Sequence, residues 1–170
     1  PVAYVSGRFA AYVRDGVGMI ARTLQVRAGQ ESDNATMTAE STAKAAGVGV
    51  VVSTGIVANA VVDGVVEAYI GAPSGSTRGG TGTIKLTGAA DVFAESKFSA
   101  TTSLATAGIG VGTLTVLVPR SFVSGITRAY LGDGANITAT SLDVLANGRS
   151  SADATTKSLT VSFAGATGAG

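Results

Sequence analysis

Stretches in which apolar and polar residues alternate recur along the chain, and many are bounded by Asp-Gly, Gly-Gly or Asn-Gly pairs. Alternation with a period of two is typical of β-strands, because successive side chains point to opposite faces of a strand. The abundant Thr, Val and Ile residues also suit a pleated surface better than a helix. The pattern therefore predicts an all-β chain, with strands of about five residues and almost no helix.

A nine-residue pattern, V-[SD]-G-x-x-x-A-Y-[VIL], occurs three times without gaps, at Val5–Val13, Val62–Ile70 and Val123–Leu131. Self-similarity at a fixed period, here about 57 to 61 residues, is the signature of a repeat architecture. We therefore expect a single β-solenoid segment over residues 1–170, cut from a longer array. Its units are predicted at about 7–63, 64–124 and a truncated 125–170.

Shorter matches follow each copy of this pattern in the same order along the chain. They pair Asp15–Ala21 with Asp133–Ala139, Leu24–Ala28 with Ile84–Gly88 and Leu142–Ala146, Ala39–Ser41 with Ala94–Ser96, and Gly47–Val52 with Gly108–Gly112. The second unit carries a Gly-rich insertion at about residues 72–82, with Gly71-Ala72-Pro73-Ser74-Gly75 in place of the Asp-Gly pair. We expect the corner of that unit to differ from the other two.

Period-two alternation then indicates which side chains face inward. The predicted inward residues near the repeated tyrosine are Ala11, Val13, Ala68, Ile70, Ala129 and Leu131, and those of the later strands are Leu24, Val26, Ala28, Ile84, Leu86, Leu142, Val144 and Ala146. The three tyrosines, Tyr12, Tyr69 and Tyr130, fall on the opposite, outward face together with Ala10, Glu67 and Arg128, and Gln25, Lys85 and Asp143 also face out.

These features predict a right-handed parallel β-helix with about three coils per repeat of 57–61 residues. Each coil would take about 20 residues, and strands would stack about 4.8 Å apart. The tyrosines would then form a sparse outward column with steps of roughly 14 Å, three strand spacings. A narrow interior accounts for a composition with 24 Gly, no Trp and many small residues.

Composition excludes several classes of chemistry. The chain has neither Cys nor His, which rules out disulfides, thiolate chemistry, serine–histidine triads and imidazole or thiolate metal sites. Twelve basic and eleven acidic residues give a net charge of +1, which offers no surplus for binding nucleic acid or an anionic membrane. We therefore expect no cofactor, no nucleic-acid partner and no membrane insertion.

The strings Ala129–Ala139 and Glu67–Gly71 resemble the AYIGDGAxVTA repeats of very large bacterial surface exoproteins. These include leukotoxin-like, haemagglutinin-like and autotransporter-type adhesins, and the resemblance covers essentially the whole chain. It implies a right-handed parallel β-helix that forms an extended, secreted or surface-anchored stalk. It marks a repeat architecture and carries over no catalytic, metal or cofactor residues.

Other motifs are weighed against this interpretation. Gly79–Ile84 resembles a calcium-binding glycine-rich turn, but Thr83 replaces the Asp that the motif needs, and Asp15, Asp63 and Asp133 are expected to cap Asp-Gly corners.

The uncharged stretches 45–62 and 98–119 favour buried sheet over a membrane helix. The Thr pairs 36/38, 81/83, 113/115 and 138/140 are expected on a polar outer surface instead of an ice-binding face. The acidic residues that could serve a glycosidase, Glu31, Asp33, Glu40, Asp91, Glu95 and Asp153, are scattered.

The sequence thus predicts a non-catalytic structural or adhesive segment of a large bacterial cell-surface or secreted protein. Its expected partners are neighbouring repeats of the same chain, sister filaments, or host or cell-surface glycans. Two alternatives stay open, a self-assembling extracellular fibre subunit and a polysaccharide-binding or polysaccharide-cleaving β-helix. The tyrosine column is either a contact surface for sugars or neighbouring rods, or a set of rings that shield the chain's own corners.

Overall fold

The computed structural model describes the chain apart from residues 30–35, 74, 77–79, 81 and 170, and describes side chains up to residue 161. Every regular element in this part of the chain is a strand, as the alternation predicts. The strands are β1 (Val2–Arg14), β2 (Met19–Ala21), β3 (Leu24–Ala28), β4 (Thr36–Gly71), β5 (Ile84–Leu86), β6 (Ala89–Leu131), β7 (Ile137–Thr138) and β8 (Ser141–Ala169).

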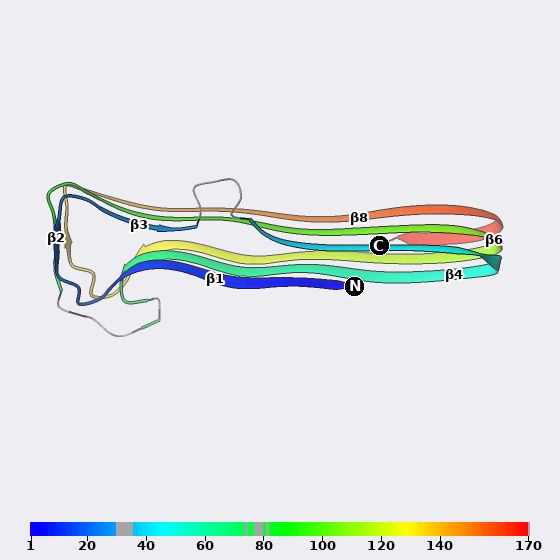
Figure 1. The fold of residues 1–170 in the computed structure, drawn as a ribbon, viewed down its shortest axis with the longest axis horizontal. Helices are drawn as coiled ribbons and strands as arrows, with labels where there is room; N and C mark the ends of the chain where they lie inside the picture. The colour runs from blue at the N-terminus through cyan, green and yellow to red at the C-terminus, as the bar shows by residue number, and fades with distance from the viewer. Residues whose placement is uncertain (30–35, 74, 77–79, 81, 170) are drawn as a thin grey trace.

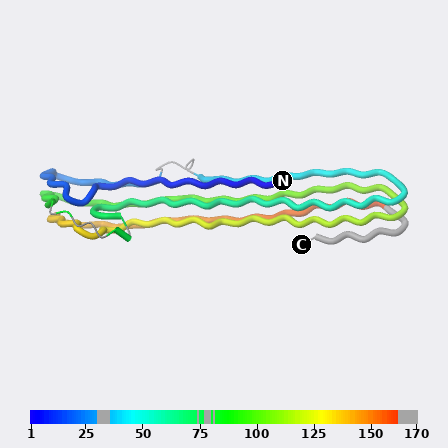
Figure 2. Tube along the Cα trace, turned by 90° about the horizontal axis from the view of Figure 1, so that it is seen from below, coloured from blue at the N-terminus to red at the C-terminus, as the bar shows by residue number. Residues whose placement is uncertain are grey.

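The strands pair in parallel, which confirms the predicted parallel arrangement. One sheet has the order β1-β4-β6-β3, with β8 also paired to β6, and a small sheet has the order β2-β5-β7. Figure 1 shows that the chain runs in long, flat passes with two long arms joined by a short side at β2, and Figure 2 shows the passes lying on one another. We call residues 2–14, 51–71 and 112–131 the tyrosine arm. The opposite arm comprises residues 24–28, 36–49, 89–110 and 141–161.

The predicted three coils per repeat are wrong, because equivalent residues of successive repeats are direct neighbours. Tyr12 pairs with Tyr69, and Tyr69 pairs with Tyr130, so one repeat is one pass. The strands are also much longer than expected, with 36 residues in β4 and 43 in β6. The glycines responsible for the error lie inside strands, as the pair Asp63-Gly64 in β4 illustrates.

Other Asp-Gly pairs do mark corners. Gly16 and Gly134 have positive φ angles of 76° and 75°, a left-handed conformation that glycine adopts at little steric cost. The second pass differs at this corner, as predicted, and Gly71 there has a φ of 104°. Two of the three proposed corner carboxylates, Asp15 and Asp133, therefore do stand at corners.

Two of the sequence alignments are corrected by the strand register. Leu24–Ala28 pairs with Ala90–Ala94 instead of Ile84–Gly88, and Ile84 pairs with Met19 and Ile137. Similarly, Ala39 pairs with Ala100, not with Ala94. The insertion between β4 and β5 is longer than the sequence alignment allowed, and it displaces these two matches, whereas the match of Gly47 with Gly108 agrees with the observed register.

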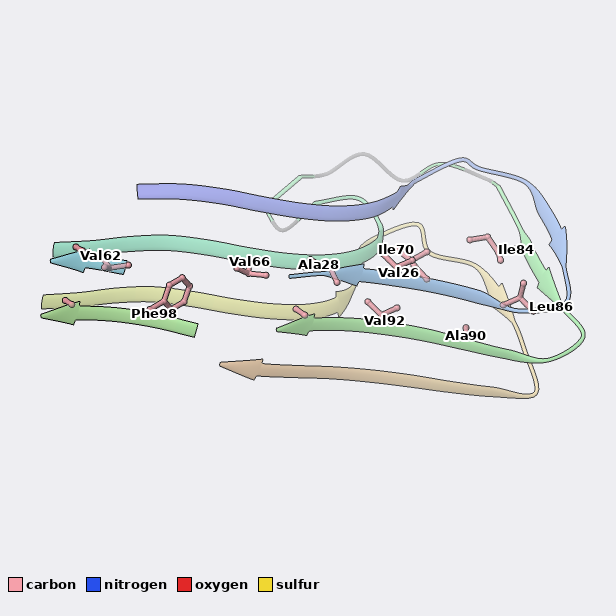
Figure 3. Packing of buried hydrophobic residues seen from close by; sticks show 14 of the residues in the cluster. Val26, Ala28, Val62, Val66, Ile70, Ile84, Leu86, Ala90, Val92 and Phe98 are labelled. Carbon is pink, nitrogen blue, oxygen red and sulfur yellow. The ribbon is translucent and has the colours of Figure 1, made fainter. Parts of the chain in front are cut away.

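The core fills the space between the two arms, as Figure 3 shows. It contains the predicted inward residues Val26, Ala28, Ala68, Ile70, Ile84 and Leu86, together with Val62, Val66, Val92 and Phe98. Leu142, Val144 and Leu131 stay 40–42% exposed, because they lie in the last strand of their arm and no further strand covers them. The alternation thus indicated the correct faces, and position in the stack decided the depth of burial.

The glycine of the repeated pattern makes room for a large side chain from the opposite arm. Phe98 is only 2% exposed, and a Cβ atom at Gly125 would overlap its ring at Cδ2. At Gly64 a Cβ atom would lie 2.6 Å from both Met37 Sδ and Phe98 Cε1. These contacts explain why glycine stands inside a strand, where it otherwise weakens the sheet.

The uncharged stretches 45–62 and 98–119 lie in β4 and β6, as strands. No helix among the described residues has the length and apolarity to span a membrane. The stretches are not buried on both faces, however. Val48, Val50, Val51, Ile109 and Val111 are exposed at the turn end, where β4 and β6 pass from one arm to the other.

One of the threonine pairs predicted on the outer surface points into the structure instead. Thr113 and Thr115 are buried, whereas Leu114 and Val116 are 51% and 46% exposed. The register skips one pair between Gly49–Gly110 and Val51–Gly112, at the turn between the arms. In residues 113–116 the threonines therefore occupy the inward positions of the alternation. The prediction that Thr113 and Thr115 lie on a polar outer surface is wrong.

The fit of Phe98 against glycine predicts a specific loss of stability. Gly125→Ala should lower the free energy of unfolding by about 1 to 3 kcal/mol, because the added methyl group overpacks a buried ring. Gly55→Ala is the matched control, since Gly55 is also inside a strand but a Cβ atom there would meet nothing within 4 Å. Urea unfolding of both variants tests this, and equal stability of the two would contradict it.

Candidate functional site

The tyrosines form a continuous stack on the outer face of the tyrosine arm. The ring centroids of Tyr12 and Tyr69 are 5.2 Å apart, those of Tyr69 and Tyr130 are 5.1 Å apart, and both pairs have interplanar angles of 9°. The exposure of Tyr12 agrees with the predicted outward face, but the predicted step of roughly 14 Å is wrong. The rings cover each other, so Tyr69 is only 6% exposed while Tyr12, in the edge strand β1, is 45% exposed.

A charged ladder lies beside the rings, two residues earlier in β4. Glu67 is buried, and its Oε2 accepts a hydrogen bond of 2.6 Å from Arg8 Nη2. Arg128 Nε lies 3.5 Å from the other carboxylate oxygen, Oε1. The hydrogen bond and the negative charge of Glu67 raise the pKa of Arg8. The outer face therefore carries a positive, negative, positive sequence of charges across the three passes.

A groove opens over the edge strand of this face. Its volume is about 990 Å³, and it is lined by Arg8, Ala10, Tyr12, Arg14, Asp15, Tyr69, Gly71, Pro73 and Ser76. Alternate residues of β1 form the floor, while Pro73 and Ser76 come from the segment that follows β4. The guanidinium carbon of Arg14 lies 5.9 Å from the centroid of the Tyr12 ring, within the range of a cation–π contact.

The groove combines guanidinium groups with an aromatic ring. Arg8 and Arg14 supply guanidinium groups that can hydrogen-bond a carboxylate or sulfate, and Tyr12 offers an exposed aromatic surface. The middle ring offers no free face, because Tyr69 is covered on both sides by its neighbours. Tyr12 is the tyrosine of the stack that lines the groove together with the two arginines and Tyr69.

The glycine-rich turn packs against a neighbouring corner in the part of it that the structure describes. Gly80 and Gly82 pack against the backbone of Gly16, which a Cβ atom at either position would overlap. Thr81 and part of the glycine-rich turn, and the carboxylates Glu31 and Asp33, lie outside the described residues. In the described ranges, no three Asp or Glu residues gather in a group that could hold a metal ion.

Sequence reasoning placed Glu67 and Arg128 on the outer face but did not pair them with each other or with Arg8. The missing information was the register, since under three coils per repeat these residues would lie far apart. The signal was present in the alignment itself. Glu67 and Arg128 occupy the same position of the repeated pattern, and opposite charges at equivalent positions are what directly adjacent strands favour.

Comparison of the chain with protein-family models, with curated proteins and with solved structures found no match.

The buried carboxylate should matter for stability. We expect Glu67→Gln to lower the free energy of unfolding by on the order of 1 kcal/mol, because the arginines lose their charge partner while their exposed side chains keep access to water. The difference from the unsubstituted chain should shrink as salt is added. Asp63→Asn, at an exposed site in the same strand, is the control, and an equal effect of both changes in chemical unfolding would contradict the assignment.

Tyrosine ionisation should destabilise the fold at high pH. Burial, and then the neighbouring Tyr130 and Tyr12, raise the pKa of Tyr69 above its ordinary value. The folded chain therefore retains this proton where the unfolded chain loses it. The resulting stabilisation is complete below about pH 10 and is lost as the pH rises through the folded pKa, by up to about 1.4 kcal/mol per pH unit.

The test compares Tyr69→Phe with the unsubstituted chain in urea unfolding between pH 8 and pH 12. Phenylalanine keeps the stacking but cannot ionise, so the variant should lose less stability at high pH. Identical pH profiles would show that Tyr69 does not titrate differently in the two states.

Proposed function

We propose that this chain is a non-catalytic structural segment of a large secreted or cell-surface bacterial protein, in which repeats stack into a right-handed β-solenoid shaft. The observation that carries the proposal is the register. Equivalent residues of three repeats lie directly on one another, so each added repeat lengthens the stack by one pass. Repeat proteins whose role depends on the length of the stack are built in this way.

The fit between passes supports a mechanical role. Each pass is joined to the next by long parallel ladders, with β4 and β6 paired from Thr36 to Ile70 except for a single skipped position. Backbone hydrogen bonds along such ladders make separation of two passes a cooperative event. The resemblance of the repeats to those of bacterial adhesins supports the proposed surface location.

We assign the adhesive contact to the groove over β1. Arg14 and Tyr12 present a guanidinium group and an aromatic ring to one space, beside Arg8, whose charge is paired with Glu67, and this combination favours an acidic saccharide on a host or cell surface. A polysaccharide-cleaving enzyme is the competing function. Cleavage would require two carboxylates on either side of the bond, and Asp15 is the carboxylate that lines this groove.

The test measures binding and turnover together. The full chain should bind acidic polysaccharides on a glycan array, and it should release no reducing ends or unsaturated products from them. Tyr12→Ser combined with Arg14→Gln should lower binding at least about tenfold, as expected from losing an aromatic contact and a charged hydrogen bond. Tyr4→Ser, an exposed tyrosine on the same face of β1 outside the groove, should leave binding unchanged.

Each other outcome removes a part of the proposal. Product release that disappears in Asp15→Asn would make the chain an enzyme. Equal binding by the groove variant and the unsubstituted chain would exclude the groove as the contact site. A complete absence of glycan binding would reject the adhesive role.

A further inference from the structure

The turn end of the structure presents a column of aliphatic side chains to solvent. At this end, which lies far from β2 in Figure 1, Val48 of β4 pairs with Ile109 of β6, and Ile109 pairs with Val161 of β8. All three side chains are exposed, and we call them the aliphatic column. Ile109 is 55% exposed although a pass lies on each side of it. Its exposure is therefore a property of the turn and not of an edge of the stack.

Further valines continue this surface around the turn. Val50, Val51 and Val111 are exposed beside the aliphatic column. A hollow of about 460 Å³ lies here, and it is lined by valine, isoleucine and glycine residues. The stretches 45–62 and 98–119, which contain the turns of β4 and β6, carry no charged residue. A continuous exposed apolar surface of this kind is typical of contact with a protein or a membrane.

The turn requires its glycines, but it does not require aliphatic side chains on its outside. A Cβ atom at Gly110 would lie 2.4 Å from the backbone oxygen of Gly49, so the inside of the turn has room only for glycine there. On the outside, threonine suits a strand as well as valine does. The chain uses such residues farther along the same face, in the column Thr42, Ser103, Thr155. Folding therefore does not explain the exposed valines.

Two lysines lie behind the aliphatic column on the same face of the opposite arm. Lys44 precedes Val48 by four residues, and Lys157 precedes Val161 by four residues. Both lysine side chains are exposed, and four strand residues span about 13 Å. In both strands the first acidic residue lies four residues farther from the turn. The turn end thus consists of an apolar tip, then positive charge, and only then negative charge.

This order of groups fits the surface of an anionic lipid bilayer. Apolar side chains of interfacial segments enter about 5–10 Å into the boundary between headgroups and acyl chains. With the aliphatic column at that depth, lysines about 13 Å behind it lie at the level of the headgroups, whose negative charge attracts them. Pairing with neighbouring passes also satisfies backbone groups of the tip, which an apolar environment requires. The net charge of +1 hides this arrangement, because the register gathers the two lysines on one face.

We propose that the turn end is a docking surface for a lipid bilayer with anionic headgroups. The aliphatic column and the neighbouring valines enter the bilayer surface, and Lys44 and Lys157 bind the headgroups. A second copy of the chain would offer the same aliphatic residues, but its own turn end carries no negative charge for the lysines to meet. Charge complementarity therefore favours the lipid surface. The proposal goes beyond the proposed function and does not depend on the groove over β1.

Flotation with vesicles tests the apolar part of this surface. The full chain should float with vesicles of phosphatidylcholine and phosphatidylserine in a density gradient. Val48→Ser with Ile109→Ser should lower its partition onto them at least about tenfold, because two aliphatic side chains lose their transfer into apolar surroundings. Ile20→Ser with Leu145→Ser is the matched control. Its two sites are 85% and 58% exposed, against 83% and 55% in the test variant, but they lie away from the turn end, so the control should bind like the unsubstituted chain.

A second variant tests the charges. Lys44→Gln with Lys157→Gln should lower the partition onto the mixed vesicles by about tenfold, and it should leave the weaker binding to pure phosphatidylcholine vesicles unchanged. The difference between this variant and the unsubstituted chain should shrink as salt is added. Far-ultraviolet circular dichroism and unfolding curves that match those of the unsubstituted chain serve as the check on folding.

Three outcomes would overturn the proposal. The first is a lack of flotation of the unsubstituted chain, and the second is equal partition of the serine variant at the turn end and its control. The third is a dimer that forms without lipid, binds no vesicles and is lost in Val48→Ser with Ile109→Ser, since it would assign the aliphatic column to a second copy. None of these results involves glycan binding or turnover, so this test and that of the proposed function fail separately.

Discussion

Parallel stacking of equivalent residues is the constraint on which the rest of this structure depends. Each side chain on a given face lies between its counterparts in the passes before and after it, about 4.8 Å away. Such a column is favourable only for certain residues. Aromatic rings stack, and the Tyr12–Tyr69–Tyr130 ladder shows this with nearly parallel rings at 5.1–5.2 Å.

Charges gain less from such stacking, because like charges on adjacent strands repel each other. At some charged positions the residue varies from one repeat to the next, whereas at others like charges stack directly, as Asp91 does on Asp143 and Lys97 on Arg149. Glu67 separates Arg8 from Arg128, and Thr101 and Ala105 separate the like charges of the opposite arm. A cross-strand charge pair contributes only about 0.2 to 1 kcal/mol, and β6 and β8 pair along their length despite the two like-charge pairs between them.

Packing between the two arms requires glycine at particular positions. Gly64 and Gly125 leave the space that Phe98 and Met37 occupy from the opposite arm. The arms can therefore approach closely without large residues on both sides. Close approach also explains why small residues dominate the core, where alanines such as Ala60, Ala68 and Ala90 are fully buried.

The groove arises where the repeat is interrupted. An insertion after β4 is present in the second pass, and it adds Pro73 and Ser76 beside the outer face of β1. A strictly regular repeat would leave that face flat. The candidate contact site thus depends on a local departure from regularity, as functional sites on repeat scaffolds generally do.

The sequence by itself determined the strand type, the repeat and the two faces of the repeated strand. Alternation of period two placed Ala68 and Ile70 inside, and the triple pattern aligned Tyr69 with Tyr12 and Tyr130 as equivalent residues, although their direct pairing was not predicted. These features are local, because each depends on residues one or two positions apart or on direct identity between repeats. For that reason they can be predicted from the sequence alone.

The tertiary structure alone decided the size of a pass, the depth of burial and the polarity at the turn end. Glycine inside a strand and glycine at a corner look alike in sequence, and only the facing Phe98 distinguishes Gly125 from Gly134. Burial of Tyr69 and exposure of Leu142 depend on which strand is last in the stack, and the burial of Thr115 depends on how the chain turns between arms. Each of these is set by residues distant in the sequence, so no alternation or motif could reveal it.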